Sequence, residues 1–228
     1  MNVATMNIEI CTASVQSVHN AVKGGAQRVE LCCRLETGGL TPPMEWIDEC
    51  KRFNLECRVL IRCREGNFVY SDAEYRQMLD EIAQCKAHGA DAVVIGFLHE
   101  DGTIDVEKTR EATQLARPMS VTFHRAFDEC ANPEKALEEI ISCGCDKLLT
   151  SGHEPTAEQG LEMLKKLVEQ AHGRISILAG SGVSSKNVKR IRQYTGVTEL
   201  HGSCKRTVNG ITDTDPDEVS ALIKNYED

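Results

Sequence analysis

The segment SVTFHRAFDECANP, residues 120–133, places a histidine, an arginine and an aspartate within five residues of one another. Its VTF run predicts a short strand, and the NP pair at its end is typical of the start of a helix. His124, Arg125 and Asp128 therefore follow the carboxyl end of a predicted strand. Histidine titrates near neutral pH, a carboxylate can transfer protons, and arginine binds anions bidentately. These side chains predict acid–base chemistry or the binding of a small anion.

Further polar side chains alternate with apolar ones in other strand-like segments. IEICT carries Glu9 and Cys11, RVELC carries Glu30 and Cys32, and ELHGS carries His201. Successive side chains of a strand point to opposite faces. Each segment therefore has one apolar face and one face that bears carboxyl, thiol or imidazole groups.

Four recurrent segments indicate which elements position these side chains. In GGAQRVELC, HGADAVVIG, CGCDKLLTSG and TGVTELHGS, a glycine precedes a strand-like run. Glycine readily adopts the left-handed conformation that closes a helix. The partner strands are IEICT, CRVLIR, MSVTFH and RISILAG, which gives eight strands in alternation with eight predicted helices. The helices are expected near residues 14–24, 43–54, 72–88, 105–116, 133–142, 156–172, 184–193 and 215–226.

Regular alternation of strand and helix predicts an α/β protein, a single-domain (β/α)8 TIM barrel of parallel strands that spans residues 1–228. No linker or low-complexity stretch divides the chain, and a doubly wound open sheet is the alternative architecture. The apolar face of each strand should meet the helices, so the polar face should point into the barrel. The predicted inward residues are Glu9, Glu30, Arg62, Thr122, His124 and His201, whereas Lys147 alternates with the outward set.

Charges that converge inside a barrel admit two interpretations. They form a plug of ion pairs, because buried charges must be paired, or they form a ligand or catalytic site. Barrel enzymes place such sites at the carboxyl ends of their strands. On the far side of that mouth, Gly180 and Gly182 follow the seventh strand and would let backbone N–H groups approach an anion; a tight turn without a ligand is the alternative. The ligand-binding candidates from these positions are Arg62, Arg125, Gly180, Gly182, His201 and Ser203.

Several blocks of sequence resemble the CutC copper-homeostasis protein family. They are IEICTASVQS, GGAQRVELC, EGNFVYSD, VTFHRAFDECANP, LLTSG and AGSGV. The resemblance implies a (β/α)8 barrel, a cytoplasmic protein, self-association into a homo-oligomer and a link to copper. The LLTSG block adds Thr150 and Ser151 to the ligand-binding candidates. The family mouth implied by the resemblance comprises Glu9, Glu30, Arg62, His124, Arg125 and Asp128.

Cys11 and Cys32 are the cysteines best placed to bind copper. They occupy matching positions in consecutive predicted strands, and both are expected to face inward. Cu(I) prefers soft thiolate or thioether ligands, so two inward thiols predict a Cu(I) site. Two small side chains that only fill the barrel are the alternative. The other cysteines are scattered without a C-x-x-C pair, and Cys143 and Cys145 are assigned to packing.

Composition narrows the classes of function. The chain is 41% hydrophobic and 27% charged, as is ordinary for a soluble globular protein. A net charge of -9 argues against binding to a nucleic-acid backbone. No apolar run reaches the length of a membrane span, and the N-terminus lacks the layout of a signal peptide. A cytoplasmic protein without nucleic-acid or membrane partners is expected.

Two functions are consistent with these residues. The first is a copper-homeostasis protein that binds Cu(I) through Cys11 and Cys32 at the barrel mouth. The second is an enzyme that acts on a small phosphorylated or carboxylated metabolite by Glu/His acid–base catalysis. A Schiff-base mechanism is disfavoured because no lysine stands at a confident inward position. The catalytic candidates are Glu9, Glu30, His124 and Asp128, and the anion is expected to bind Arg62 or Arg125.

Overall fold

Within residues 7–208 and 211–227, which the structure describes, eight parallel strands close into a barrel. The computed structural model pairs each strand with the next one along the chain and pairs the last strand with the first. The (β/α)8 barrel is therefore confirmed, and the open sheet is excluded. The strands are β1 (Ile8–Thr12), β2 (Arg28–Leu31), β3 (Glu56–Leu60), β4 (Ala92–Ile95), β5 (Ser120–Phe123), β6 (Lys147–Thr150), β7 (Ser176–Ala179) and β8 (Glu199–Gly202).

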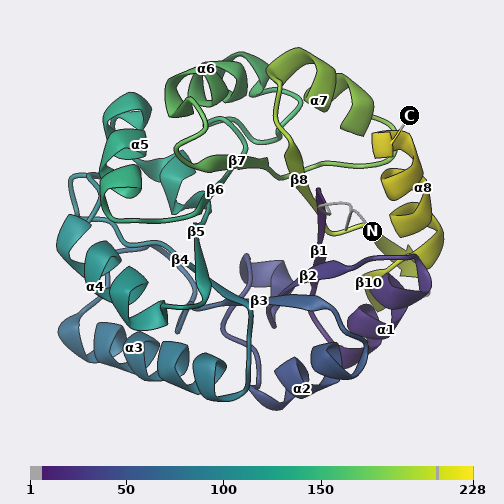
Figure 1. Cartoon of the computed structure of the whole chain (residues 1–228), viewed down its shortest axis with the longest axis horizontal. Coiled ribbons are helices and arrows are strands. Elements are labelled where there is room, and N and C mark those ends of the chain that lie inside the picture. The colour runs from purple at the N-terminus through teal and green to yellow at the C-terminus, as the bar shows by residue number, and fades with distance from the viewer. Residues whose placement is uncertain (1–6, 209–210, 228) are drawn as a thin grey trace.

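An outer ring of helices surrounds the strands (Figure 1). The helices are α1 (Val15–Lys23), α2 (Glu45–Arg52), α3 (Asp72–Ala87), α4 (Val106–Ala116), α5 (Pro133–Ser142), α6 (Leu161–Ala171), α7 (Val188–Thr195) and α8 (Pro216–Glu227). Local signals set their first residues. Asn132 caps α5 by accepting a hydrogen bond from the Lys135 N–H, with proline at the first helical position. Ser71 and Glu74 form a capping box at the start of α3.

Among the described residues, no helix combines the length and the apolar character that a membrane crossing requires.

The two faces of each strand have separate environments. Ile10 of β1 and Val29 of β2 are fully buried in the apolar layer between the strands and the helices. Their neighbours in sequence, Glu9 and Glu30, lie on the opposite face, inside the barrel. The alternation of polar and apolar residues in these strands thus predicted which face points inward.

Connected ion pairs fill the amino-terminal half of the barrel. The Glu9 carboxylate is fully buried and lies 3.2 Å from Nε of Arg28 and 3.1 Å from Nε of Arg58. Nη1 of Arg28 also contacts Oε2 of Glu199 at 2.6 Å. Arg58 donates a further hydrogen bond to the Thr122 hydroxyl at 3.1 Å. This half of the barrel matches the plug of ion pairs, one of the two interpretations that the sequence allowed.

Lys147 belongs to the same network, and the expectation that it faces outward is wrong. Its ammonium group contacts Glu199. Strand β7 lies between β6 and β8, so these two residues meet through the barrel interior. The error has a physical cause: Leu148 and Leu149 are both buried, so β6 is apolar on both faces and its pattern does not reveal which face points inward.

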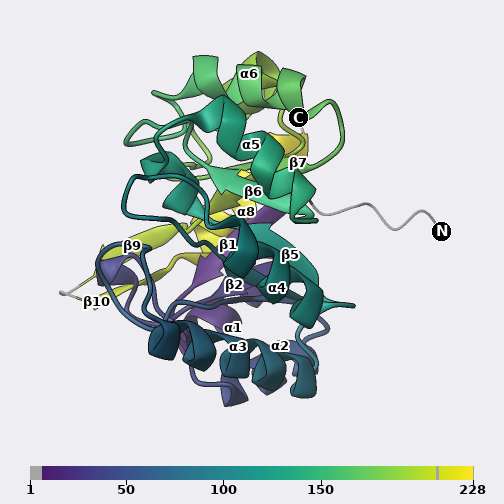
Figure 2. The ribbon, with the colours of Figure 1, turned by 90° about the vertical axis from the view of Figure 1, so that its left-hand side faces the viewer.

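A β-hairpin that the sequence analysis did not predict follows β8. Its strands β9 (Lys205–Val208) and β10 (Ile211–Thr214) pair antiparallel and project from one side of the barrel (Figure 2). The Ser17 hydroxyl of α1 donates a hydrogen bond of 2.7 Å to Asp213 of β10. The hairpin is thereby held at the carboxyl ends of the strands, where Lys205 reaches the rim of a cavity.

Candidate functional site

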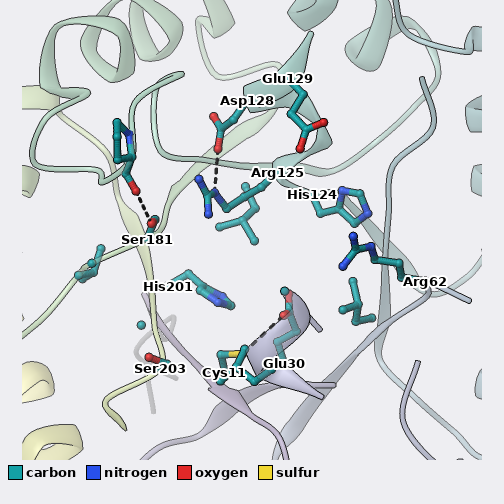
Figure 3. A pocket seen from close by; sticks show the side chains of 18 of the residues that line it. Cys11, Glu30, Arg62, His124, Arg125, Asp128, Glu129, Ser181, His201 and Ser203 are labelled. Atoms are coloured by element: carbon teal, nitrogen blue, oxygen red, sulfur yellow. Dashed lines mark hydrogen bonds and ion pairs between the residues drawn. The ribbon is translucent and has the colours of Figure 1, made fainter. Parts of the chain in front are cut away.

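A cavity of about 800 Å³ opens at the carboxyl ends of the barrel strands (Figure 3). The structure brings most of the predicted site residues together around it and leaves the others outside its lining. Those that line the cavity are Cys11, Glu30, Arg62, His124, Arg125, Asp128, Gly182, His201 and Ser203. Those outside the lining are Glu9, Cys32, Thr150, Ser151 and Gly180.

His201 connects the cavity to the ion pairs beneath it. Its Nδ1 lies 2.8 Å from Oε1 of Glu9. Burial favours the neutral acid, but His201 and the neighbouring guanidinium groups outweigh burial and lower the pKa of Glu9 to about 2. Burial likewise opposes a charge on His201, yet Glu30, Cys11 and Glu9 raise the pKa of its imidazole well above the ordinary value. Glu9 is therefore a buried counter-ion below the cavity, with no access to a ligand.

Three potential metal ligands meet at the cavity floor. The ligand atoms of Cys11, Glu30 and His201 all lie within 4.8 Å of one another. The Cys11 sulfur is also 3.8 Å from the Cys32 sulfur. The hydrogen bond with Cys32, together with burial, raises the pKa of the Cys11 thiol well above its ordinary value. A cation at this point would have to displace the thiol proton.

Glu30 is poised to exchange a proton. Its side chain is 5% exposed, Oε1 accepts a long contact of 3.9 Å from the Cys11 thiol, and Oε2 has no partner. Burial raises the pKa of Glu30 to about 7, although His201 acts in the opposite direction. A carboxyl group with such a pKa can act as either acid or base at neutral pH.

His124 is a neutral hydrogen-bond donor on the cavity wall. Burial, assisted by Arg62, lowers its pKa to about 3. Its Nδ1 accepts a hydrogen bond of 3.1 Å from the Ala126 N–H, so the proton resides on Nε2, which has no partner. A side chain at position 96 would collide with the ring, since a Cβ there would lie 2.3 Å from Cε1 of His124. Gly96, which sequence reasoning missed, makes room for the imidazole.

Arg62 carries a buried charge without an acidic partner. It is 6% exposed, and no Asp or Glu among the residues described makes an ion pair with it. Backbone carbonyls of Thr37, Gly39 and Gly66 accept hydrogen bonds from its terminal nitrogens at 3.1, 3.0 and 2.7 Å. Its Nε is buried and unpartnered. The guanidinium is thus held in place but not neutralised.

Asp128 organises its loop, and its oxygens are already occupied. It accepts hydrogen bonds from Nε of Arg125 at 2.8 Å and from the backbone and hydroxyl of Ser151 at 3.1 and 2.9 Å. The Thr150 hydroxyl and the His153 N–H donate to it as well. This saturation leaves Asp128 poorly suited to proton transfer, and it directs Thr150 and Ser151 away from the cavity.

Donors on either side of Gly182, in the loop after β7, already have acceptors within the protein. The Gly180 N–H donates to the Thr150 carbonyl at 2.9 Å. The backbone N–H and hydroxyl of Ser185 donate to the Glu218 carboxylate of α8 at 2.7 and 2.9 Å. An internal carboxylate therefore occupies the donors of Ser185 near the start of α7, and the anion expected beside Gly182 stays a prediction. Gly180 instead makes room for Leu149, because a Cβ there would lie 2.6 Å from Cδ1 of that side chain.

Two interior arginines were missed, although the sequence contained a signal for both. Arg28 shares the face of Glu30 in β2. Arg58 of β3 lies four residues before Arg62, so alternation along the strand places it on the same inward face. Extending the same alternation toward the first residue of each strand would have placed both inside the barrel. Their partner Glu9 then needs no ligand for neutralisation.

These features define a class of protein: a closed (β/α)8 barrel with a charged cavity at the carboxyl ends of its strands. Barrels of distant sequence share this fold alone. A thiamine phosphate pyrophosphorylase from Pyrococcus furiosus superposes with a TM-score of 0.65 at 19% identity, over 97% of this chain and 95% of the other.

The CutC family model matches residues 6–206, and the chain belongs to the CutC family. A CutC family protein of Vibrio cholerae serotype O1 is 46% identical over 203 residues, which cover 88% of this chain and 80% of the relative. A Bacteroides fragilis CutC family protein is 46% identical over 202 residues, with coverage of 88% and 80%. The crystal structure of CutC from Streptococcus agalactiae, described as a copper homeostasis protein, superposes with a TM-score of 0.82 at 31% identity, over 87% and 99% of the two chains.

Proposed function

We propose that this protein acts in copper homeostasis by binding Cu(I) between Cys11 and Cys32. The observation that carries the proposal is the separation of 3.8 Å between the two sulfurs, with Cys11 in the lining of an open cavity and Cys32 directly behind it. Soft thiolates are the ligands that Cu(I) prefers. The description of the Streptococcus agalactiae relative as a copper homeostasis protein supports the same conclusion.

His201 is the third residue that could take part in binding Cu(I). Its Nδ1 is engaged by Glu9, so Nε2 is the ring nitrogen that could bind a cation together with Cys11 and Glu30. Copper is cargo in this proposal, and its arrival releases the two thiol protons into the cavity, together with the Nε2 proton of His201 if that nitrogen binds the ion. The family resemblance extends the proposal to a cytoplasmic homo-oligomer. Light scattering on the purified protein tests the oligomeric state, and cell fractionation tests the compartment.

A competition titration tests the copper site. The reduced protein is titrated with Cu(I) under anaerobic conditions against a chromophoric Cu(I) chelator. Replacing Cys11 and Cys32 together with serine is expected to abolish stoichiometric binding. The matched control replaces Cys143 and Cys145, which are equally buried but lie outside the cavity lining, and should leave binding intact. An unchanged titration of the Cys11/Cys32 variant would exclude this site.

A second function is favoured by a different observation: an enzyme that acts on a small carboxylated or phosphorylated metabolite. Glu30, His124 and Arg62 each carry a buried polar atom without a partner, and all three line one cavity. In this proposal Glu30 is the general base, and neutral His124 donates a hydrogen bond to a developing oxyanion. A turnover screen with the metal-free protein tests it, because Glu30→Gln should abolish any activity found while Glu138→Gln, on the surface, should not.

A further inference from the structure

We propose that the inner wall of the cavity binds an α-hydroxy carboxylate, with Arg62 holding the carboxylate, His124 donating a second hydrogen bond and Glu30 accepting one from the hydroxyl group. The inference deepens the second of the two proposed functions, the acid–base enzyme, because it names the class of molecule that such an enzyme would take. Binding itself can be tested without turnover.

The charge of Arg62 sets the sign of the ligand. Other arginines of the barrel interior and mouth have acidic partners: Arg28 and Arg58 pair with Glu9, and Arg125 pairs with Asp128. Arg62 has only neutral carbonyl acceptors. A buried charge is costly unless it is paired, so the cavity beside Arg62 favours an anion.

His124 lies beside Arg62 and presents a hydrogen-bond donor to the same ligand. Both side chains pack on the ring of Phe68, with Cζ of Arg62 at 5.0 Å and the imidazole centroid at 4.9 Å from it. Figure 3 shows them on one wall of the cavity, with Glu30 rising from the floor toward the same region. The hydrogen bond from Ala126 fixes the tautomer, so Nε2 of His124 bears a proton that has no acceptor. Two donors, one of them cationic, suit the two oxygens of a carboxylate.

Glu30 selects the group next to the carboxylate. Its Oε2 is a buried acceptor without a partner, so it suits a ligand group that donates a hydrogen bond. An ammonium group beside the carboxylate would be repelled by the Arg62 guanidinium, whereas a hydroxyl group is neutral. This unpaired cation favours an α-hydroxy acid over an α-amino acid.

A phosphate is less suitable for this position than a carboxylate. Arg62 has one unpartnered nitrogen, and it is the only arginine of the cavity lining, among the described residues, without an acidic partner. The volume of about 800 Å³ admits a longer chain attached to the hydroxy acid.

Calorimetric titration of the metal-free protein tests the inference with glycolate, the smallest member of the class. Acetate lacks the hydroxyl group, glycine replaces it with ammonium, and inorganic phosphate replaces the carboxylate. Glycolate is expected to bind most tightly of the four. Arg62→Gln should weaken glycolate binding by about tenfold or more, the usual effect of losing a hydrogen bond to a charged group.

Three controls separate a loss of glycolate binding from a loss of the folded cavity. Arg52→Gln, on the exposed side of α2, should leave glycolate affinity unchanged. Arg62→Lys keeps the charge but not Nε, and should retain part of the affinity. Cu(I) titration of Arg62→Gln reports whether the cavity floor is intact, because Arg62 is not among the proposed copper ligands.

The possible results distinguish the inference from the proposed enzyme. Three results would each overturn the inference. They are tighter binding of phosphate or glycine than of glycolate, glycolate binding by Arg62→Gln that equals that of the wild type, and no glycolate binding by the wild-type protein. Glycolate binding that depends on Arg62 supports the inference even if no hydroxy acid is turned over. The absence of turnover would instead contradict the proposed enzymatic function. Turnover of another metabolite without glycolate binding would retain the enzyme and reject the inference.

Discussion

Replacing Glu9 with glutamine tests the view that the lower half of the barrel is a structural network of ion pairs. Glutamine keeps the shape of the side chain but removes the negative charge that Arg28, Arg58 and His201 share. Three buried groups then lose their common counter-ion. The expected result is a protein that folds with reduced stability, because unpaired buried charges are costly.

Two independent magnitudes give the expected size of this effect. Removing one partner of a buried ion pair costs about 3–5 kcal/mol. Lowering the pKa of Glu9 from 4.5 to about 2 corresponds to about 3 kcal/mol of preference for the ionised carboxylate in the folded state. For a protein of this length, such a loss lowers the midpoint of thermal unfolding by roughly 10 °C.

Urea unfolding of the Glu9→Gln protein measures this loss against a matched surface variant. Glu138→Gln removes a carboxylate whose pKa is also lowered to about 2, by Arg174 and Gln170, but which is exposed to solvent. The surface change should cost far less, because water screens the charges that remain. Equal stabilities of the two variants at neutral pH would refute the argument from burial.

The pH dependence adds a second check on Glu9. Its folded-state pKa is depressed, so its contribution is complete above pH 4.5 and is lost as the pH falls toward 2. The stability difference between wild type and Glu9→Gln should therefore shrink on acidification. A difference that stays constant down to about pH 3 would show that the charge of Glu9 is not its source.

Two further predictions concern His124. Its folded-state pKa of about 3 lies below the ordinary 6.5, so protonation of this side chain in the unfolded state destabilises the folded protein as the pH falls through this interval. Between pH 7 and pH 5, wild type should lose about 2 kcal/mol of stability that His124→Gln does not lose, as measured by urea unfolding at both pH values. Gly96→Ala places a methyl group 2.3 Å from the imidazole and should cost about 1–3 kcal/mol while weakening glycolate binding; a variant with unchanged affinity would show that the ring position is irrelevant to the ligand.

Alternation within strands predicted the barrel because it is a local consequence of backbone geometry. Strands with one clearly polar face, such as β1 with Glu9 and β2 with Glu30, could be oriented from sequence. Strand β6 could not, because adjacent leucines make both of its faces apolar and conceal the orientation of Lys147. The hairpin after β8 did have a signal, an Asn-Gly pair between β-branched residues in TVNGIT, which is typical of tight hairpins.

Contacts between distant segments limited what could be predicted about the site. Nothing in the local sequence indicates that Glu218 reaches back to Ser185 and occupies its N–H and hydroxyl donors. The same applies to Asp128, whose oxygens are occupied by Thr150 and Ser151 from the next strand. Residue type identified these groups as chemically capable, but only their partners decide whether they remain free to act.

The pairing of charges separates the two halves of the barrel. In the lower half each cation has an acidic partner: Arg28 and Arg58 share Glu9, Glu199 contacts Arg28 and Lys147, and Glu56 contacts Arg58. In the upper half Arg62 lacks an acidic partner among the described residues, although it is as buried as the others. Burial of charge alone therefore does not distinguish a structural plug from a binding site in this protein. The unpaired charge does, because a fold gains nothing from an isolated cation that a ligand does not neutralise.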